Sequence, residues 1–377
     1  MFVKTINKNE NIQKLLSKLS KRNVGYYEKN QFLLPRREYY RNIFCVDNKF
    51  RYFSSAFKIL FFYYCFMDKN IAIGADIGGS HITSAAIDLS SGKILRETIC
   101  EKAVNNQASA TAIIGVWADA LSGALSKVPF EKVKGIGFAM PGPFDYVKGI
   151  CYIKGVAKYE NLYGFNITDA IASSLDVPED FLIRFMNDAS SFAVGEAWAG
   201  SAKEASRSLS ITLGTGFGSA FIEDMIPIVD GPLVPKIGCV YHLPYRDGIA
   251  DDYFSTRGLL GRYKKATGVE LSGVKELAQL NNTDKVVPDL FRDFGDNLGL
   301  FLAPWLKGFD AEILVIGGNI SHAYNLFGKH FELSLKEQNC NCEVALSELK
   351  EDAALLGSAY LLDDDFWKSV QHALPLM

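Results

Sequence analysis

The sequence of this 377-residue chain predicts an α/β protein built from two similar halves. Each half opens with an apolar strand, a short glycine-rich turn and a second strand, first across residues 71–89 and again across residues 209–223. Helical periodicity follows in both halves and leads to a further buried strand. A pattern that recurs in the same order favours a duplicated architecture with a cleft between the halves.

Apolar spacing predicts the elements of the first half in order. Strands are expected at residues 71–75, 82–89 and 94–99. A helix follows, because apolar side chains recur at helical spacing at Ile114, Trp117, Leu121 and Leu125. A buried strand at 133–138 comes next, and an apolar stretch at 181–185 then precedes a helical run at 190–198.

The second half repeats the opening of the first. Residues 209–223 contain a strand, a turn rich in glycine and a second strand. Helical segments then lead to a short apolar strand at 313–316, which is closed by Gly317 and Gly318.

Composition narrows the classes of protein that fit. A chain of this length that is 48% hydrophobic buries a sizeable core and favours two domains over one. A net charge of −3 gives no overall attraction to nucleic acid or to an acidic membrane surface. The longest apolar run, residues 59–67, is about half the roughly 18 residues that a membrane span needs. We therefore expect no membrane and no nucleic-acid partner.

Cysteine usage indicates a reduced, cytoplasmic protein. The seven cysteines are odd in number and mostly isolated, which is not the pattern of a disulfide framework. Cys340 and Cys342 form a single close pair without further ligands nearby, so we expect no metal there.

The first 67 residues differ in composition from the rest. They hold 13 Lys and Arg against four Asp and Glu, and only one of the 32 glycines. Because the first predicted strand follows Met67 closely, we hypothesise that folding, and even translation, begins at Met67 and that residues 1–66 are an appended segment. The alternative is a basic DNA-binding arm, but the segment lacks the spacing of a helix-turn-helix.

The first glycine turn has the composition of a phosphate-binding loop. Gly78 and Gly79 let backbone N–H groups approach an anion closely, and Ser80 adds a hydroxyl donor. Asp76 stands at the end of the preceding strand, where a carboxylate can hold Mg²⁺ directly or through water. An ordinary hairpin turn is the alternative interpretation.

The second glycine turn, with Gly214, Thr215 and Gly216, repeats this chemistry. Two such turns in equivalent places favour phosphate held by backbone donors, with a nucleotide in the cleft between the halves. The chain has no Gly-x-x-x-x-Gly-Lys-Ser/Thr run, which excludes a P-loop. No strand leads through Gly-x-Gly-x-x-Gly into a helix, which argues against a dinucleotide fold.

Polar residues stand at a predicted strand-to-helix junction. Asp188 in Asn187-Asp188 is either a cap of the following helix or a general base, with Asn187 orienting a sugar. Phosphoryl transfer to an alcohol needs a carboxylate near the hydroxyl, Mg²⁺ and donors around the phosphates. His242, in a loop-like stretch, is a candidate contact to a sugar hydroxyl or a solvated loop histidine.

Taken together, these motifs resemble the ROK family of bacterial sugar kinases and repressors across about residues 70–360. Seven motifs occur in the family's order. They are similar to the first phosphate motif (76–80), the Gly-x-x-x-Pro-Gly-Pro-x-Asp loop (137–145), the sugar-contacting Asn-Leu (161–162), the catalytic Asn-Asp-Ala (187–189), the second phosphate motif (214–218), the adenosine motif (317–321) and the closing helix (352–357).

The resemblance implies an actin-like, ribonuclease H-like two-domain ATPase fold that closes over ATP, Mg²⁺ and a sugar. Asp188 then takes the proton from a sugar hydroxyl, usually the 6-hydroxyl, and the family commonly forms homodimers. The implied sugar contacts are Asn161, Asn187, His242 and Asp251. The implied nucleotide contacts add Gly317, Gly318 and Asn319 to the two turns. We expect a small domain at 68–187 completed by 353–377, and a large domain at 188–352.

Four departures from the family's pattern are present. The family's zinc-binding cysteine run is absent after His242, so we expect no zinc. Cys239 stands where the family has the glutamate of Glu-x-Gly-His, and a thiol cannot accept two strong hydrogen bonds as a carboxylate can. This argues against the usual contacts near carbons 1 and 2 of the sugar, and hence against glucose. Asp251 is a shorter carboxylate than the family's glutamate, and His81 replaces a common lysine.

Two alternatives to a kinase stay open. One is a sugar-sensing transcriptional regulator of the same family, for which the basic N-terminal segment is the only candidate DNA-binding part. The other is a sugar-binding protein that has lost catalysis because Cys239 replaces a ligand. Sugar binding without ATP turnover would distinguish the second from a kinase.

Overall fold

The computed structural model describes residues 69–155 and 158–377 of the chain. The basic segment and the predicted start of folding at Met67 lie outside these residues. Within the described residues, no helix is long and apolar enough to cross a membrane.

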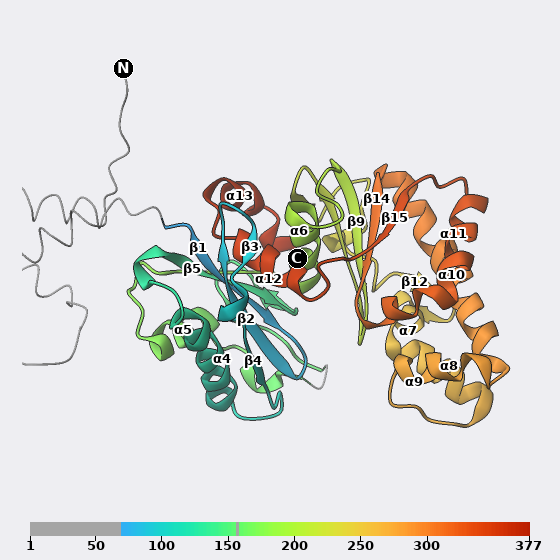
Figure 1. Cartoon of the computed structure of the whole chain (residues 1–377), viewed down its shortest axis with the longest axis horizontal. Helices are drawn as coiled ribbons and strands as arrows, with labels where there is room; N and C mark the ends of the chain where they lie inside the picture. The colour runs from blue at the N-terminus through green and yellow to red at the C-terminus, as the bar shows by residue number, and fades with distance from the viewer. Residues whose placement is uncertain (1–68, 156–157) are drawn as a thin grey trace, which may run out of the picture. The chain divides into compact units, whose positions relative to one another are not determined.

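The first sheet has six strands in the order β3-β2-β1-β5-β8, with β4 beside β2 (Figure 1). The strands are β1 (Ile71–Ile77), β2 (His81–Asp88), β3 (Lys93–Ile94), β4 (Cys100–Ala103), β5 (Val133–Met140) and β8 (Leu182–Asn187). β1 and β2 form an antiparallel hairpin, whereas β5 and β8 continue the sheet in parallel. Helix α4 (Ala110–Leu125) packs against β2 and β4, and α5 (Ile167–Leu175) packs against α4.

The second sheet repeats this topology in the order β11-β10-β9-β14-β15. Its strands are β9 (Arg207–Leu213), β10 (Phe217–Glu223), β11 (Ile226–Ile228), β14 (Ile313–Gly317) and β15 (Glu343–Leu346). β9 and β10 are antiparallel, and β14 and β15 are parallel to β9. Each strand therefore takes the place of one strand of the first sheet, which confirms the duplicated α/β architecture.

One predicted strand is wrong. Residues 94–99 do not form a continuous strand, because the 3₁₀ helix η2 (Arg96–Thr98) separates β3 from β4. The Thr98 hydroxyl accepts the backbone N–H of Ala86 at 2.8 Å and donates to the Leu95 carbonyl oxygen at 2.6 Å. A side chain therefore satisfies a backbone donor of β2 that a neighbouring strand would otherwise pair.

Five helices lie in the connections from β13 to β14 and from β14 to β15. They are α7 (Ala250–Phe254), α8 (Thr256–Thr267), α9 (Val274–Gln279), α10 (Val286–Phe309) and α11 (Tyr324–Glu337). The structure also has two short antiparallel hairpins. One pairs β6 (Phe144–Asp145) with β7 (Ile150–Cys151), and the other pairs β12 (Pro244–Tyr245) with β13 (Gly248–Ile249). Most of the buried apolar side chains form two clusters, one associated with each sheet.

Two helices lie between the sheets (Figure 1). α6 (Asp188–Ala199) packs against β9 and β10, and α12 (Asp352–Tyr360) packs against β1 and β5. Each helix contributes a glycine to the contact between them, Gly195 from α6 and Gly357 from α12. A Cβ on Gly195 would lie 1.9 Å from the Ala353 carbonyl oxygen, and one on Gly357 would lie 1.8 Å from that of Ser191. The close approach of the two backbones therefore requires these glycines.

Substitution of Gly357 by alanine is expected to lower the free energy of unfolding by about 1–3 kcal/mol, because the added Cβ meets backbone rather than a movable side chain. The matched control is Gly261→Ala in α8, where a Cβ meets nothing within 4 Å. That variant should be as stable as the parent or slightly more stable. Urea unfolding of both variants measures the difference, and equal midpoints would contradict the packing argument.

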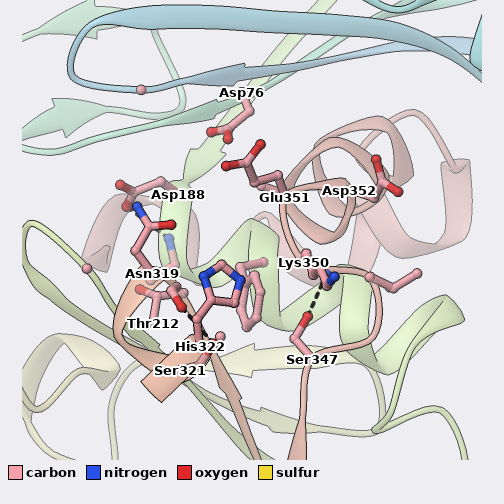
Figure 2. A pocket seen from close by; sticks show the side chains of 18 of the residues that line it. Asp76, Asp188, Thr212, Asn319, Ser321, His322, Ser347, Lys350, Glu351 and Asp352 are labelled. Atoms are coloured by element: carbon pink, nitrogen blue, oxygen red, sulfur yellow. Dashed lines mark hydrogen bonds between the residues drawn. The ribbon is translucent and has the colours of Figure 1, made fainter. Parts of the chain in front are cut away.

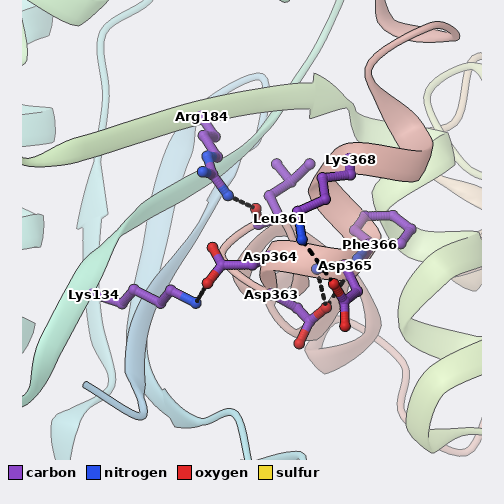
Figure 3. Close-up of polar contacts among 8 residues, drawn as sticks. All are labelled: Lys134, Arg184, Leu361, Asp363, Asp364, Asp365, Phe366 and Lys368. Atoms are coloured by element: carbon purple, nitrogen blue, oxygen red, sulfur yellow. Dashed lines mark hydrogen bonds and ion pairs between the residues drawn. The ribbon is translucent and has the colours of Figure 1, made fainter. Parts of the chain in front are cut away.

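The C-terminal helices are attached to the first sheet through charged side chains (Figure 3). Lys134 of β5 pairs with Asp364 at 2.8 Å, at the start of α13 (Asp364–Val370). Arg184 of β8 donates to the Leu361 carbonyl oxygen at 2.6 Å and lies over the Trp367 ring. These contacts join α13 and the residues before it to the first sheet. The predicted domain boundaries stay a prediction.

Candidate active site

A cavity of about 520 Å³ lies where strand ends of both sheets meet (Figure 2). Its walls come from the ends of β1, β9 and β14, from the start of α6 and from the segment that leads into α12. Open α/β sheets bind ligands at the carboxyl ends of their strands. Of the predicted site residues, the cavity brings together Asp76, Gly78, Asp188, Gly214, Gly317, Gly318 and Asn319.

The first turn is held in place through its carbonyl groups. The Tyr159 hydroxyl donates to the Gly78 carbonyl oxygen at 2.6 Å, and the Asn106 amide donates to that of Gly79. The backbone N–H of Val104 donates to the Ser80 carbonyl oxygen at 2.8 Å. These bonds fix the peptide planes of the turn. Gly79 and Ser80 themselves are exposed and do not line the cavity.

The second turn is held by Asp251. One carboxylate oxygen of Asp251 accepts the backbone N–H of Phe217 at 2.6 Å, and the other accepts from Arg257 at 2.7 Å. The turn is closed by the Gly214 N–H, which donates to the Gly216 carbonyl oxygen at 3.0 Å. Asp251 therefore shapes the second glycine turn. Thr215 and Gly216 lie outside the cavity wall.

Asn187 and Asp188 have different roles at the strand-to-helix junction. Asn187 is the residue that caps α6, because its side-chain oxygen accepts the Ser190 N–H at 3.2 Å. Its amide group donates to the Tyr146 hydroxyl at 3.3 Å. Asp188 is the first residue of the helix and lines the cavity. The helix cap is therefore Asn187 and not Asp188. The carboxylate of Asp188 lies at the positive end of the helix dipole.

Three carboxylates line the cavity, Asp76, Asp188 and Glu351, and those of Asp76 and Glu351 point toward each other (Figure 2). Burial, together with the nearby charges of Asp188 and Glu351, raises the pKa of Asp76 from its usual value of 3.8 to about 7. Carboxylate oxygens are the ligands that Mg²⁺ prefers, and a cation here would relieve the repulsion. In the described part of the chain, no three His, Cys, Asp or Glu residues are grouped to hold a metal ion alone. Asp76 fits a Mg²⁺ that takes its other ligands from water and phosphate.

Residues 317–321, which were predicted to be an adenosine motif, end β14 in a turn that requires glycine. Gly318 has φ 81°, and a Cβ there would lie 2.5–2.8 Å from the backbone of Leu213. The following residues, Asn319 in the 3₁₀ helix η7 (Asn319–Ala323) among them, line the cavity.

The remaining predicted sugar contacts lie outside the cavity wall. Asn161 donates its amide hydrogens to the carbonyl oxygens of Gln107 and Ala108, at 3.1 and 2.9 Å. The His242 ring nitrogen is 3.7 Å from the Cys239 sulfur. Burial raises the pKa of the Cys239 thiol to about 12, so the thiol is neutral at physiological pH. Burial and the charge of Lys236 lower the pKa of His242.

Several cavity residues were not singled out as site residues from the sequence. Asp352 was predicted only as the start of the closing helix. It forms a two-bond ion pair with Arg96. The acidic pair Glu351-Asp352, directly before an apolar helix, could have identified both residues as candidates. Little in the local sequence marks the other polar residues of the wall, which are Thr212, His322, Ser347 and Lys350.

Comparison with known proteins gives three findings. The model of the ROK family matches residues 72–365. The glucokinase of Thermotoga maritima is 25% identical over 326 residues, which cover 79% of this chain and 99% of that protein. The structure of a ROK family glucokinase from Streptomyces griseus in complex with glucose and AMPPNP has a TM-score of 0.61 at 22% identity, over 77% of this chain and 98% of that one.

A ROK family transcriptional regulator, a homologue of the Escherichia coli MLC protein, shares the fold as well. Its TM-score is 0.65 at 16% identity, over 81% of each chain. The predicted actin-like α/β fold is therefore confirmed. Because a kinase and a regulator have the same fold, the fold alone does not choose between these functions.

Proposed function

Because the chain belongs to the ROK family, we propose that it is an ATP-dependent kinase that phosphorylates a hydroxyl group of a hexose or hexose derivative. The observation that carries the proposal is the convergence of Asp188, Asp76 and both glycine turns on one cavity. A regulator that only senses sugar does not need a general base beside phosphate-binding turns.

Asp188 is the general base of the proposed reaction. Its carboxylate accepts the proton of the acceptor hydroxyl, expected to be the 6-hydroxyl, as that oxygen attacks the γ-phosphorus and the bond to ADP breaks. Positioned acid–base groups of this kind typically contribute 10²–10⁴-fold in rate. Asn187 holds the start of α6 through its cap, so it keeps Asp188 oriented.

The nucleotide side combines backbone donors with few charges. The turns at Gly78 and Gly214 hold the phosphates, and Gly317, Gly318 and Asn319 hold the adenosine. When bound, Mg²⁺ neutralises the charge that develops on the phosphates. Asp76 is the residue that would hold it, directly or through water.

The sugar side is proposed from Asn161, Asn187, His242 and Asp251. Asp251 acts through the second turn rather than by direct contact, since both of its oxygens are already bound. The neutral Cys239 thiol beside His242 is a weak acceptor, which disfavours a sugar that needs a carboxylate there. A cytoplasmic homodimer is also part of this proposal.

A coupled ADP-release assay tests the function. The protein with Mg-ATP is offered glucose, mannose, fructose, allose, N-acetylglucosamine and N-acetylmannosamine, with a sugar-free control. We expect release that depends on at least one sugar and is absent without it. Binding of a sugar with no release from any would contradict the kinase and support a sugar-binding or regulatory protein.

A further inference from the structure

A fully buried carboxylate lies at the far end of the helix that begins with Asp188. Glu196, in the last turn of α6, is 0% exposed. Its two oxygens accept the backbone N–H of Ser201 at 2.9 Å and the hydroxyl of Ser347 at 2.5 Å. Burying a carboxylate is costly, and here burial raises the pKa of Glu196. The group is therefore expected to have a role that an apolar side chain cannot fill.

Ser347 connects this carboxylate to the wall of the nucleotide cavity. Its hydroxyl oxygen accepts the backbone N–H of Lys350 at 2.7 Å (Figure 2). Its own N–H donates to the Ile316 carbonyl oxygen at 2.9 Å, at the end of β14. Lys350 has φ 55°, a conformation that a residue with a side chain adopts only when its surroundings impose it. The Ser347 hydroxyl is one such constraint.

The turn from Ser347 to Lys350 shapes two cavities at once. Ser347, Leu349 and Lys350 line the active-site cavity and also a neighbouring cavity of about 1120 Å³. The next residue, Glu351, carries its carboxylate toward Asp76 (Figure 2). A shift of this turn would therefore change the nucleotide wall and the group of carboxylates together.

The packing around the carboxylate leaves little room for such a shift. A Cβ on Gly200 would lie 2.2 Å from a Glu196 oxygen and 2.7 Å from a methyl carbon of Leu349. The end of α6 is thus in close contact with the turn from two directions, through a hydrogen bond and through direct packing.

We propose that Glu196 and Ser347 are positioning residues of the nucleotide site. The hydrogen bond from the Ser347 hydroxyl to the Glu196 carboxylate holds residues 347–351 against α6, and so places Lys350 and Glu351 where Mg-ATP binds. Because Asp188 begins the same helix, the bond fixes the nucleotide wall relative to the general base. This inference rests on the proposed kinase function.

The test compares Ser347→Ala with Ser347→Thr, which keeps the hydroxyl. We expect Ser347→Ala to raise KM for ATP and Kd for Mg-AMPPNP about tenfold, with KM for the sugar and kcat within about twofold, and Ser347→Thr to restore most of the loss. The matched control is Ser334→Ala, which removes a buried serine hydroxyl that donates to the Asp296 carbonyl oxygen, away from both cavities. A purely structural role would lower stability in both alanine variants without this split.

Glu196→Gln adds a second variant. Its amide oxygen can still accept from the Ser347 hydroxyl, but its NH₂ group cannot accept the Ser201 N–H. We therefore expect about a threefold rise in Kd for Mg-AMPPNP, and no further rise when the substitution is added to Ser347→Ala. Additive effects of the two substitutions would overturn the link. If Ser347→Ala does not fold, Ser347→Cys replaces it, because a thiol keeps the volume but donates weakly.

Calorimetric titration with Mg-AMPPNP separates the two ways of failing. If the unmodified protein binds no nucleotide, the proposed function and this inference both fall. If it binds nucleotide and a folded Ser347→Ala binds within twofold of it, the inference alone is overturned.

Discussion

Replacement of Asp188 by asparagine is expected to lower kcat by about 10²–10⁴-fold, with KM for ATP and for the sugar changed by less than about threefold. Asparagine has nearly the same shape as aspartate but cannot accept a proton. The helix should form normally, because its cap is the side chain of Asn187. The ADP-release assay measures the rate, using the sugar that the panel identifies.

A matched control separates loss of the base from loss of charge at a helix start. Asp169 stands in the first turn of α5, where Asn166 is the capping residue in the same way that Asn187 is in α6. Asp169→Asn removes the same charge far from the cavity wall, and its kcat should stay within about twofold of the parent. An Asp188→Asn variant that keeps more than a tenth of the parent rate would contradict its assignment as the base.

The parts of the site that the sequence predicted are those with a local signature. A strand that ends in Asp76 and a pair of glycines is recognisable within a few residues, and so is the turn at Gly214. The duplicated topology followed from the same two turns, because each lies inside a hairpin that starts a sheet. The local sequence could not show whether Asn187 or Asp188 caps the helix, because both residue types favour the N-cap position.

What the sequence did not predict depends on contacts between distant residues. The Glu196 and Ser347 side chains are 151 positions apart, and only the packing of α6 against the β15–α12 connection brings them together. The break at residues 96–98 has the same origin, since the Thr98 hydroxyl satisfies a backbone group of another strand. Apolar periodicity carries no information about either bond, because it reports which face of an element is buried.

Asp76→Asn is expected to remove turnover and yet stabilise the ligand-free protein. The substitution deletes the proposed Mg²⁺ contact, and we expect a loss of at least about 10²-fold in kcat/KM. It also deletes a charge that burial, Asp188 and Glu351 all disfavour. A pKa raised from 3.8 to about 7 corresponds to about 4 kcal/mol of folding free energy, so the melting temperature at pH 8 should rise by about 5 °C or more.

The stabilising effect of Asp76→Asn should depend on pH. Between pH 4 and pH 7 the unfolded chain releases the Asp76 proton while the folded protein keeps it, so the parent loses stability as pH rises through this range. The stabilisation by Asp76→Asn should therefore be absent near pH 4 and complete above pH 7, in EDTA. Asp88→Asn is the opposite control, because hydrogen bonds from Ser90 lower the pKa of Asp88 and its removal should cost stability at pH 8. Added Mg²⁺ should stabilise the parent but not Asp76→Asn; equal stabilisation of both would show that the cation is held elsewhere.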